Sequence, residues 1–314
     1  MTTSLVTGGA GFIGSHLAHE LLERGHRVRI LDNFSTGKRE NIAPMLNDVE
    51  LVEGDIRDLA ACLKTVAGAE FVFHQAALAS VPLSIEDPFL TDETNVDGTL
   101  NILWAAKSAG VRKVVFASST AVYGDNPVLP KKEGMSGIPL SPYALSKWIG
   151  EKTCQSFRLI YGVPSVCLRY FNVFGPRQDP RSQYAAAIPI FISRMLDGLS
   201  PVIFGDGEQT RDFVFVGDVV QANILAAESE SGSGDVFNIA SAERLSVNAL
   251  VRLINDLLGK ELSPVFAPPR PGDILHSWAD IQKAGKRLRF HPQTLFRQGL
   301  EKTVSWFQDQ RRLG

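Results

Sequence analysis

A tyrosine and a lysine four residues apart, Tyr143 and Lys147, are the side chains best suited to proton transfer. Residues at this spacing share one face of a helix, and Ser141 and Pro142 are typical of an N-cap and a first helical position. A tyrosine has a pKa of about 10 and is a poor base at neutral pH, but a nearby ammonium favours the phenolate. Alone, such a pair is more typical of an ordinary helix surface.

Ser119 gives this pair a chemical context. It follows the apolar run 113–117, which predicts a strand, and parallel sheets bind ligands outside the carboxyl ends of their strands. A serine hydroxyl there can hold a reacting alcohol while Tyr143 takes its proton and Lys147 supplies positive charge. If hydride leaves the same carbon, the alcohol is oxidised and the reaction needs a hydride acceptor.

The first residues of the chain predict where that acceptor binds. The apolar run 5–7 leads into Gly8 and Gly11, and Phe12 and Ile13 begin an apolar pattern at helical spacing. A strand, a glycine turn and a helix in this order cradle a diphosphate, because the turn has no side chains in the way and the helix N-terminus offers N–H groups. Gly14 lies where the helix must pack close to the sheet.

Asp32 ends a second apolar run about 20 residues further on. A carboxylate there can accept hydrogen bonds from the adenosine ribose and repels a 2′-phosphate, which favours NAD over NADP. The polar loop that follows either wraps the adenosine or is an ordinary connection, and its candidate residues are Asn33, Ser35, Thr36 and Gly37.

Two further strand ends extend the predicted NAD site. Asp55 can face the adenine amino group with Ile56 packed on the ring, although Asp55 or Asp58 can instead cap the helix 59–66, an interpretation we favour for Asp58. After the next strand, small residues allow a flat cofactor to lie against the backbone, namely Ala76, Ala77 and Ala79.

Strand-like and helix-like segments alternate through the first half of the chain. This alternation predicts an α/β fold with a Rossmann-like, doubly wound parallel sheet. The expected strands are 5–7, 28–31, 49–52, 71–74, 113–117 and 163–169, and the long expected helices are 91–109 and 142–161. Asn95, within the first of these helices, either faces solvent or braces the active-site backbone, and we favour the second. Beyond residue 170 the alternation weakens, so we predict an NAD-binding domain over 1–170 and a smaller, partly interleaved substrate-binding region over 171–314.

Composition excludes several other classes of protein. The chain has 314 residues, 44% of them hydrophobic, and a net charge of −2, which predicts no broad attraction to nucleic acid or membrane. No apolar stretch is long enough to span a bilayer, and the first strand begins too early to leave room for a signal peptide. Cys62, Cys154 and Cys167 show no paired spacing, which indicates reduced thiols in a cytoplasmic protein. The six histidines show no metal-ligand spacing, so no metal is expected.

Four motifs together carry a resemblance to a known family. They are the stretch from Gly8 to Gly14, Ser119, the pair Tyr143 and Lys147, and the run Arg169-Tyr-Phe-Asn172. With them the sequence resembles extended short-chain dehydrogenases/reductases of the NAD-dependent sugar epimerase/dehydratase family. The resemblance covers nearly the whole chain and implies a Rossmann domain, tightly held NAD with Tyr170 beside it, a UDP-sugar region in the second half, and a homodimer through helices 91–109 and 142–161.

Members of that family catalyse several reactions, and Thr120 and Ala121 help to separate them. Related 4,6-dehydratases carry Asp-Glu at these positions, and related decarboxylases carry Ser-Glu. Without a carboxylate at Ala121 no obvious group expels the C6 hydroxyl, which favours plain 4-epimerisation. C4 of a hexose is not adjacent to a carbonyl and its hydrogen is not acidic, so inversion passes through a transient ketone.

The resemblance also implies which residues bind the sugar nucleotide. Asn172, Arg211 and Arg270 match positions that hold the UDP diphosphate, Asp273 matches one near the uridine ribose, and further contacts are implied for Ser80, Ser119, Thr120, Tyr143 and Ala187. Alternatively, Arg211 pairs with Asp212 and Arg270 with Asp273 on the surface.

Ser277 matches a position that is often a bulky tyrosine in epimerases restricted to UDP-glucose. A serine leaves room for an acetamido group at C2, unless it is merely a loop residue. The expected activity is therefore interconversion of UDP-GlcNAc with UDP-GalNAc, and of UDP-glucose with UDP-galactose. The alternatives are an epimerase restricted to the non-acetylated sugars, a dehydratase or decarboxylase, and a non-catalytic NAD-binding relative; such relatives usually lack the tyrosine or the lysine.

Overall fold

The computed structural model describes residues 1–135, 137–180, 186–230, 232–269 and 275–313. Its central layer is a seven-stranded parallel sheet in the order β11-β6-β5-β4-β1-β2-β3. The strands are β1 (Thr3–Thr7), β2 (Arg27–Asp32), β3 (Val49–Glu53), β4 (Phe71–His74), β5 (Lys113–Ser119), β6 (Ser165–Tyr170) and β11 (Val236–Ile239). This is the Rossmann-like, doubly wound sheet that the alternation predicts, and the chain reverses direction across the sheet between β1 and β4.

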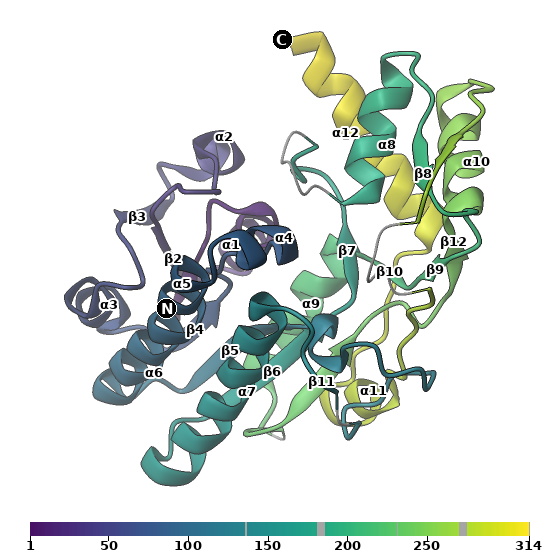
Figure 1. Ribbon diagram of the computed structural model, residues 1–314. Helices are drawn as coiled ribbons and strands as arrows, with labels where there is room; N and C mark the ends of the chain where they lie inside the picture. Colours follow the sequence, from purple (N-terminus) through teal and green to yellow (C-terminus); the bar gives the residue numbers. More distant parts are fainter. Residues whose placement is uncertain (136, 181–185, 231, 270–274, 314) are drawn as a thin grey trace.

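Helices cover both faces of the sheet, which explains why its strands are continuous apolar runs (Figure 1). In β5, for example, Val114, Val115 and Phe116 are all buried. One face packs against α1 (Phe12–Glu23), α9 (Val216–Glu228) and α11 (Gln282–Leu288), and the other against α3 (Leu59–Val66), α6 (Gly98–Ala109) and α7 (Pro142–Tyr161).

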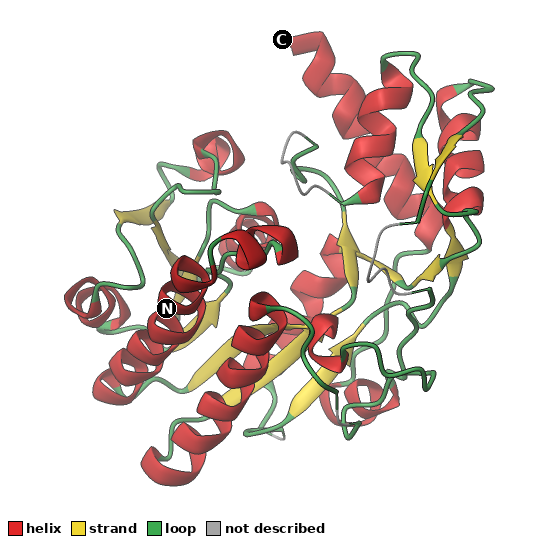
Figure 2. Cartoon of the chain, viewed as in Figure 1, coloured by secondary structure: helices red, strands yellow, loops and turns green. Residues whose placement is uncertain are grey.

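The second half of the chain builds a smaller lobe with its own core (Figure 2). Its helices α8 (Ala187–Leu196), α10 (Val247–Leu258) and α12 (Phe296–Leu313) pack with short strand pairs. These strands are β7 (Asn172–Phe174), β8 (Val202–Phe204), β9 (Thr210–Arg211), β10 (Phe213–Phe215), β12 (Leu245–Ser246) and β13 (Val265–Ala267). Phe174 contacts the rings of Phe213, Phe215 and Phe296, so β7 anchors this core directly after the last strand of the first half.

The two halves are not separate along the chain. β11 comes from the second half but pairs with β6 at the edge of the main sheet, and α9 and α11 pack on that sheet. The boundary at residue 170 that the sequence predicts falls between β6 and β7. Among the described residues, no helix has both the length and the apolar character that crossing a membrane requires.

The helix expected over 91–109 is wrong in one respect. The structure has α5 (Pro88–Asp92), then a π-helical turn at Glu93–Asp97, and only then α6. Asn95 lies in this turn, where its side chain bonds groups outside the helix, and π-helical turns are frequent at functional sites. The remaining short helices are α2 (Arg39–Ile42), α4 (Val81–Glu86) and the 3₁₀ turns Ala43–Met45 and Thr120–Tyr123.

Candidate active site

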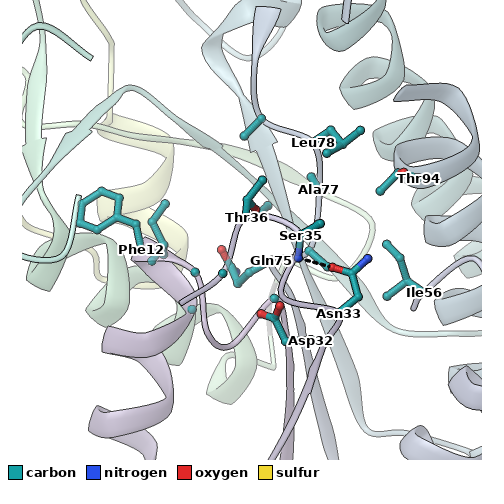
Figure 3. A pocket seen from close by; sticks show the side chains of 18 of the residues that line it. Phe12, Asp32, Asn33, Ser35, Thr36, Ile56, Gln75, Ala77, Leu78 and Thr94 are labelled. Carbon is teal, nitrogen blue, oxygen red and sulfur yellow. Dashed lines mark hydrogen bonds between the residues drawn. The ribbon is translucent and has the colours of Figure 1, made fainter. Parts of the chain in front are cut away.

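A cavity of about 330 Å³ opens where β1, β4 and β5 end. Sixteen of the residues predicted from the sequence line it: Gly8, Gly11, Phe12, Ile13, Asp32, Asn33, Ser35, Thr36, Gly37, Ile56, Ala76, Ala77, Ala79, Tyr143, Lys147 and Tyr170. Figure 3 shows Ile56 and Thr94 on one side of this cavity and Phe12 on the opposite side. The sequence pattern thus brings together segments that are far apart along the chain.

The glycine turn between β1 and α1 has no room for side chains. Gly8 has a φ of +67°, and a Cβ at this residue would lie 2.8 Å from the backbone of Ala76. At Gly14, a Cβ would lie 2.1 Å from the carbonyl oxygen of Gly8. The backbone at the N-terminus of α1 is therefore open to the cavity, as a diphosphate requires.

Asp32 stands at the end of β2, beside that turn. Its carboxylate accepts hydrogen bonds from the N–H of Ala10 at 2.9 Å and of Phe34 at 2.8 Å. Burial raises the pKa of Asp32, and these two bonds oppose the rise. The loop that follows is ordered by its own residues, since the N–H of Ser35 donates to Asn33 at 3.0 Å (Figure 3). These contacts place the adenosine-side candidates around one end of the cavity.

Asp55 does not line the cavity. Its carboxylate accepts from the guanidinium of Arg57 at 2.8 Å and from the amide of Asn33 at 2.9 Å, and these bonds lower its pKa to about 2. Asp58 is the N-cap of α3, as we expected, because its side chain accepts from the N–H of Ala60 and Ala61. Arg57, two residues away, therefore competes for the Asp55 carboxylate with the adenine amino group that the sequence analysis suggested as its partner.

The catalytic candidates meet where β5 ends and α7 begins. Ser141 caps α7 by accepting from the N–H of Ala144 at 3.1 Å, which places Tyr143 in the first turn and Lys147 one turn later. Ser119 lies close enough to Tyr143 for a side-chain hydrogen bond between them to lower the pKa of Tyr143. The Nζ of Lys147 lies 5.9 Å from the centre of the Tyr143 ring. The three groups thus form one cluster, with Tyr143 and Lys147 at the cavity wall.

The electrostatics of this cluster differ from the simple expectation. Burial raises the pKa of Tyr143, and the hydrogen bond with Ser119 opposes the rise. The Nζ of Lys147 donates to the carbonyl oxygen of Ala117 at 2.9 Å, and burial lowers the pKa of Lys147 to about 8. Lys147 therefore remains protonated at neutral pH, but its charge alone does not make Tyr143 a strong base.

Asn95 braces the backbone of this site, which is the alternative that we favoured. Its Oδ1 accepts from the N–H of Leu78 at 2.9 Å, and its Nδ2 donates to the carbonyl oxygen of Leu78 at 3.1 Å and to Ser146 Oγ at 3.0 Å. Ser146 precedes Lys147, so Asn95 connects the chain after β4 to α7.

The candidates for the sugar nucleotide lie around Asp212. Asn172 donates to the carbonyl oxygen of Asp212 through its backbone N–H and its amide, both at 3.1 Å. The N–H of Ser277 donates to the carbonyl oxygen of Thr210 at 3.0 Å, and Ser277 is buried. Because Arg211 stands between Thr210 and Asp212, the structure brings Asn172, Arg211 and Ser277 to one short segment.

The Asp212 carboxylate does not pair with Arg211. It accepts from the N–H and hydroxyl of Ser241 at 2.9 and 2.8 Å and from the N–H of Ala279 at 3.2 Å. Burial raises the pKa of Asp212 to about 6. Arg211 instead donates to the carbonyl oxygens of Thr210 and Leu275. Asp212 is thus a structural link between three segments, and the surface pair with Arg211, given above as the alternative, does not form.

The other sugar-nucleotide candidates stand at element ends. Ser80 caps α4 by accepting from Leu83, Thr120 begins a 3₁₀ turn, and Ala187 begins α8. Arg270 and Asp273 lie outside the described residues. Within the described ranges, no group of three or more His, Cys, Asp or Glu side chains is placed to hold a metal.

Several cavity residues had no role in the sequence analysis. Those with polar side chains are Lys38, Asn41, Gln75, Thr94, Ser118, Arg177 and Asp179. Gln75 and Ser118 carry a usable signal, since each stands at the end of a predicted strand. Arg177 and Asp179 come from the second half of the chain, and only the folded structure brings them to the cavity.

Residues 4–240 match the NAD dependent epimerase/dehydratase family. The chain belongs to this family. NAD is therefore its cofactor. A Thermus thermophilus UDP-glucose 4-epimerase solved with NAD has the same fold, with a TM-score of 0.88. It is 39% identical to this chain, and the match covers 98% of this chain and 99% of that one.

Other members of the family are similar over nearly the full length. A UDP-N-acetylglucosamine 4-epimerase from Methanobrevibacter ruminantium, solved with UDP-N-acetylmuramic acid, is 44% identical with a TM-score of 0.95, over 98% of this chain and 99% of that one. A putative UDP-glucose 4-epimerase of Methanocaldococcus jannaschii is 42% identical over 98% of this chain and 99% of its own. A UDP-N-acetyl-alpha-D-glucosaminuronate decarboxylase of Bacillus cytotoxicus is 37% identical over 97% of both chains.

Proposed function

We propose that this enzyme is a UDP-hexose 4-epimerase that interconverts UDP-GlcNAc and UDP-GalNAc, and also UDP-glucose and UDP-galactose. The observation that carries the proposal is the cluster of Ser119, Tyr143 and Lys147, of which Tyr143 and Lys147 stand at the wall of the NAD cavity. Ala121 stands two residues after Ser119, where related dehydratases and decarboxylases have a carboxylate. The cluster is therefore equipped to oxidise and re-reduce an alcohol, with no acid at that position for elimination.

In the proposed mechanism, Ser119 positions the O4 hydroxyl of the sugar and Tyr143 takes its proton. NAD, held by the residues that line the cavity, would supply the hydride acceptor that oxidation of the alcohol at C4 needs. Lys147 supplies a positive charge near Tyr143 and can donate a hydrogen bond to the nicotinamide ribose. Burial by itself raises the pKa of Tyr143, and the positive charges of Lys147 and of the oxidised nicotinamide both favour the phenolate and so oppose that rise. The 4-keto sugar then rotates, and Tyr143 returns the proton after hydride has reached the other face.

The sugar nucleotide is assigned to the segment around Asp212. Asn172 and Arg211, with Arg270, are the proposed diphosphate ligands, since guanidinium and amide groups suit diphosphate oxygens. Asp273 is proposed for the uridine ribose, and Ser80, Thr120 and Ala187 for the sugar. Ser277 is the proposed gate at C2, because its small buried side chain leaves more space than a tyrosine.

Incubation with UDP-GlcNAc and added NAD, followed by chromatographic separation of the sugar nucleotides, tests the activity. The expected product is UDP-GalNAc, and Tyr143→Phe is expected to remove nearly all turnover while NAD stays bound. A keto product would indicate a dehydratase, and release of carbon dioxide from a uronic acid substrate would indicate a decarboxylase. Either result, or no conversion, would contradict the proposed epimerase activity.

The C2 gate has its own test. Ser277→Tyr is expected to suppress turnover of UDP-GlcNAc much more than turnover of UDP-glucose. An equal loss for both substrates would show that Ser277 does not select at C2.

We also propose a cytoplasmic homodimer. The three cysteines are free and buried, which suits a reducing compartment. α6 and α7 carry the exposed apolar side chains Leu100, Trp104, Trp148 and Tyr161, which suit a contact between two copies. Light scattering is expected to give twice the chain mass, and a monomer at micromolar concentration would contradict it.

A further inference from the structure

The loop 175–180, directly after β7, is tied to the first half of the chain at two points. The Nε2 of His16, on α1, lies 3.0 Å from the carbonyl oxygen of Pro176. The Nζ of Lys38, just before α2, lies 2.6 Å from the carboxylate of Asp179. Lys38 and Asp179 both line the NAD cavity, and each side chain is about one-third exposed. The ion pair therefore crosses the solvent-facing edge of the cavity.

Arg177 lies between these two anchors and also lines the cavity. Its Nη1 is buried and has no hydrogen-bond partner among the described residues. An arginine keeps its proton in a protein, so a buried guanidinium N–H without a partner is suited to an anion. Its backbone has a φ of +67°, a strained conformation for a residue with a side chain, and such residues gather at ligand clamps.

The neighbours of Arg177 indicate which anion this is. Gly11 and Phe12, at the N-terminus of α1, line the same cavity. Burial lowers the pKa of His16, one turn further along α1, to about 4, and the nearby positive charge of Arg177 adds to this lowering. Arg177 thus faces the first turns of α1, which is where a dinucleotide diphosphate binds.

Lys38 is itself fixed to the glycine turn. Its backbone N–H donates to the carbonyl oxygen of Ala10 at 3.0 Å, and the N–H of Ala10 donates to Asp32 at 2.9 Å. The ion pair with Asp179 therefore connects the loop 175–180 to the same turn that receives the diphosphate.

We propose that Arg177 and the ion pair between Lys38 and Asp179 form a clasp over the dinucleotide diphosphate, which keeps the cofactor in place throughout turnover. This inference rests on the proposed epimerisation, in which the cofactor must not leave between oxidation and reduction. The clasp takes one arm from each half of the chain, so it is complete only when both halves are in place.

The rate of NADH release tests the clasp. The enzyme is loaded with NADH and chased with excess NAD in the absence of any sugar nucleotide, and the release is followed by NADH fluorescence. Arg177→Gln is expected to speed release about 10-fold or more, as loss of a charged hydrogen bond does. Lys38→Ala and Asp179→Ala are each expected to speed it about two- to five-fold, as loss of a part-exposed ion pair does. The double variant Lys38→Asp/Asp179→Lys is expected to return close to the original rate.

Arg39→Gln is the matched control. It removes the neighbouring ion pair with Glu53, which lies wholly within the first half of the chain, and is expected to leave NADH release unchanged. Release at the original rate from both Arg177→Gln and Lys38→Ala, with circular dichroism showing folded protein, would overturn the clasp.

The Michaelis constant for UDP-GlcNAc at saturating NAD distinguishes the two possible diphosphates. It is expected to change less than about two-fold in Arg177→Gln; a large rise with unchanged NADH release would assign Arg177 to the substrate and overturn the clasp. Because NADH release needs no sugar, faster release from the variants would support the clasp even if the unmodified enzyme converted no UDP-sugar, and only the epimerase proposal would then fail.

Discussion

The buried ion pair between Glu151 and Arg169 offers the sharpest test of how the active-site frame is held. Arg169 donates to both carboxylate oxygens of Glu151, at 2.8 and 2.7 Å, and Ser118 donates to the same carboxylate at 2.5 Å. The side chains of Glu151 and Arg169 are 0% and 7% exposed. This pair fixes α7 to the ends of β5 and β6, directly beside Ser119 and Tyr170.

Glu151→Leu is expected to lower the free energy of unfolding by about 3–5 kcal/mol, because it leaves the Arg169 guanidinium buried without its partner. With an unfolding entropy of about 2.1 cal/mol/K per residue, a chain of this length should melt about 5–8 °C lower. Urea unfolding and thermal melting at one fixed NAD concentration measure both quantities, since bound NAD stabilises the folded state.

Two further variants make the reasoning refutable. Glu151→Leu/Arg169→Met removes both charges and is expected to recover most of the loss, because an apolar pair needs no compensation for buried charge. Glu70→Leu breaks the exposed pair with Arg112 and should cost about 1 kcal/mol or less. If Glu151→Leu costs no more than Glu70→Leu, or if the double variant is less stable than the single one, this account of the frame is wrong.

Three more predictions concern the site itself. Lys147→Met is expected to abolish turnover yet raise the free energy of unfolding at pH 7 by up to about 3 kcal/mol. Burial lowers the pKa of Lys147 from 10.5 to about 8, so the free-energy cost of its buried ammonium fades as the pH rises from 8 to 10.5. Urea unfolding at pH 7 and at pH 9.5 should therefore show that the stability gained by the variant shrinks with pH. Burial likewise lowers the pKa of His74 from 6.5 to about 3, so the unfolded chain binds the proton first and the free energy of unfolding falls as the pH drops below 6.5. His74→Gln should remove up to about 2 kcal/mol of this fall between pH 6.5 and 5. If the free energy of unfolding depended on pH as it does in the unmodified enzyme, this prediction would be contradicted. Gly14→Ala is expected to lose NAD binding in equilibrium dialysis, because its Cβ would lie 2.1 Å from the Gly8 carbonyl oxygen. Gly134→Ala is the control and should bind NAD normally, because no atom lies within 4 Å of the new Cβ and the backbone of Gly134 does not have a positive φ.

The parts of the fold and site that the sequence predicts are those set by local rules. The glycine turn, Asp32 and the capped start of α7 each depend on a few neighbouring residues, so their motifs place Gly8, Asp32 and Tyr143 at the cavity. The alternation of strands and helices likewise predicts the parallel sheet, because each strand must be apolar on both faces.

The remainder depends on tertiary contacts. Arg177 reaches the cavity because the loop 175–180 docks on α1, a contact between residues about 160 positions apart that no local sequence pattern reports. The raised pKa of Tyr143 reflects burial, which spacing does not report. The ion pair of Asp55 could have been predicted in part, since the sequence places Arg57, a partner of opposite charge, only two residues later.

The position of β11 has a consequence for how the chain is made. β6 is complete at residue 170, but its outer edge has no strand to pair with until residues 236–239 have left the ribosome. For that interval the nascent polypeptide presents an unpaired edge strand, the feature that promotes association between chains. A gene truncated after residue 170 would make that exposure permanent, so a chain of residues 1–170 is expected to precipitate when it is produced alone.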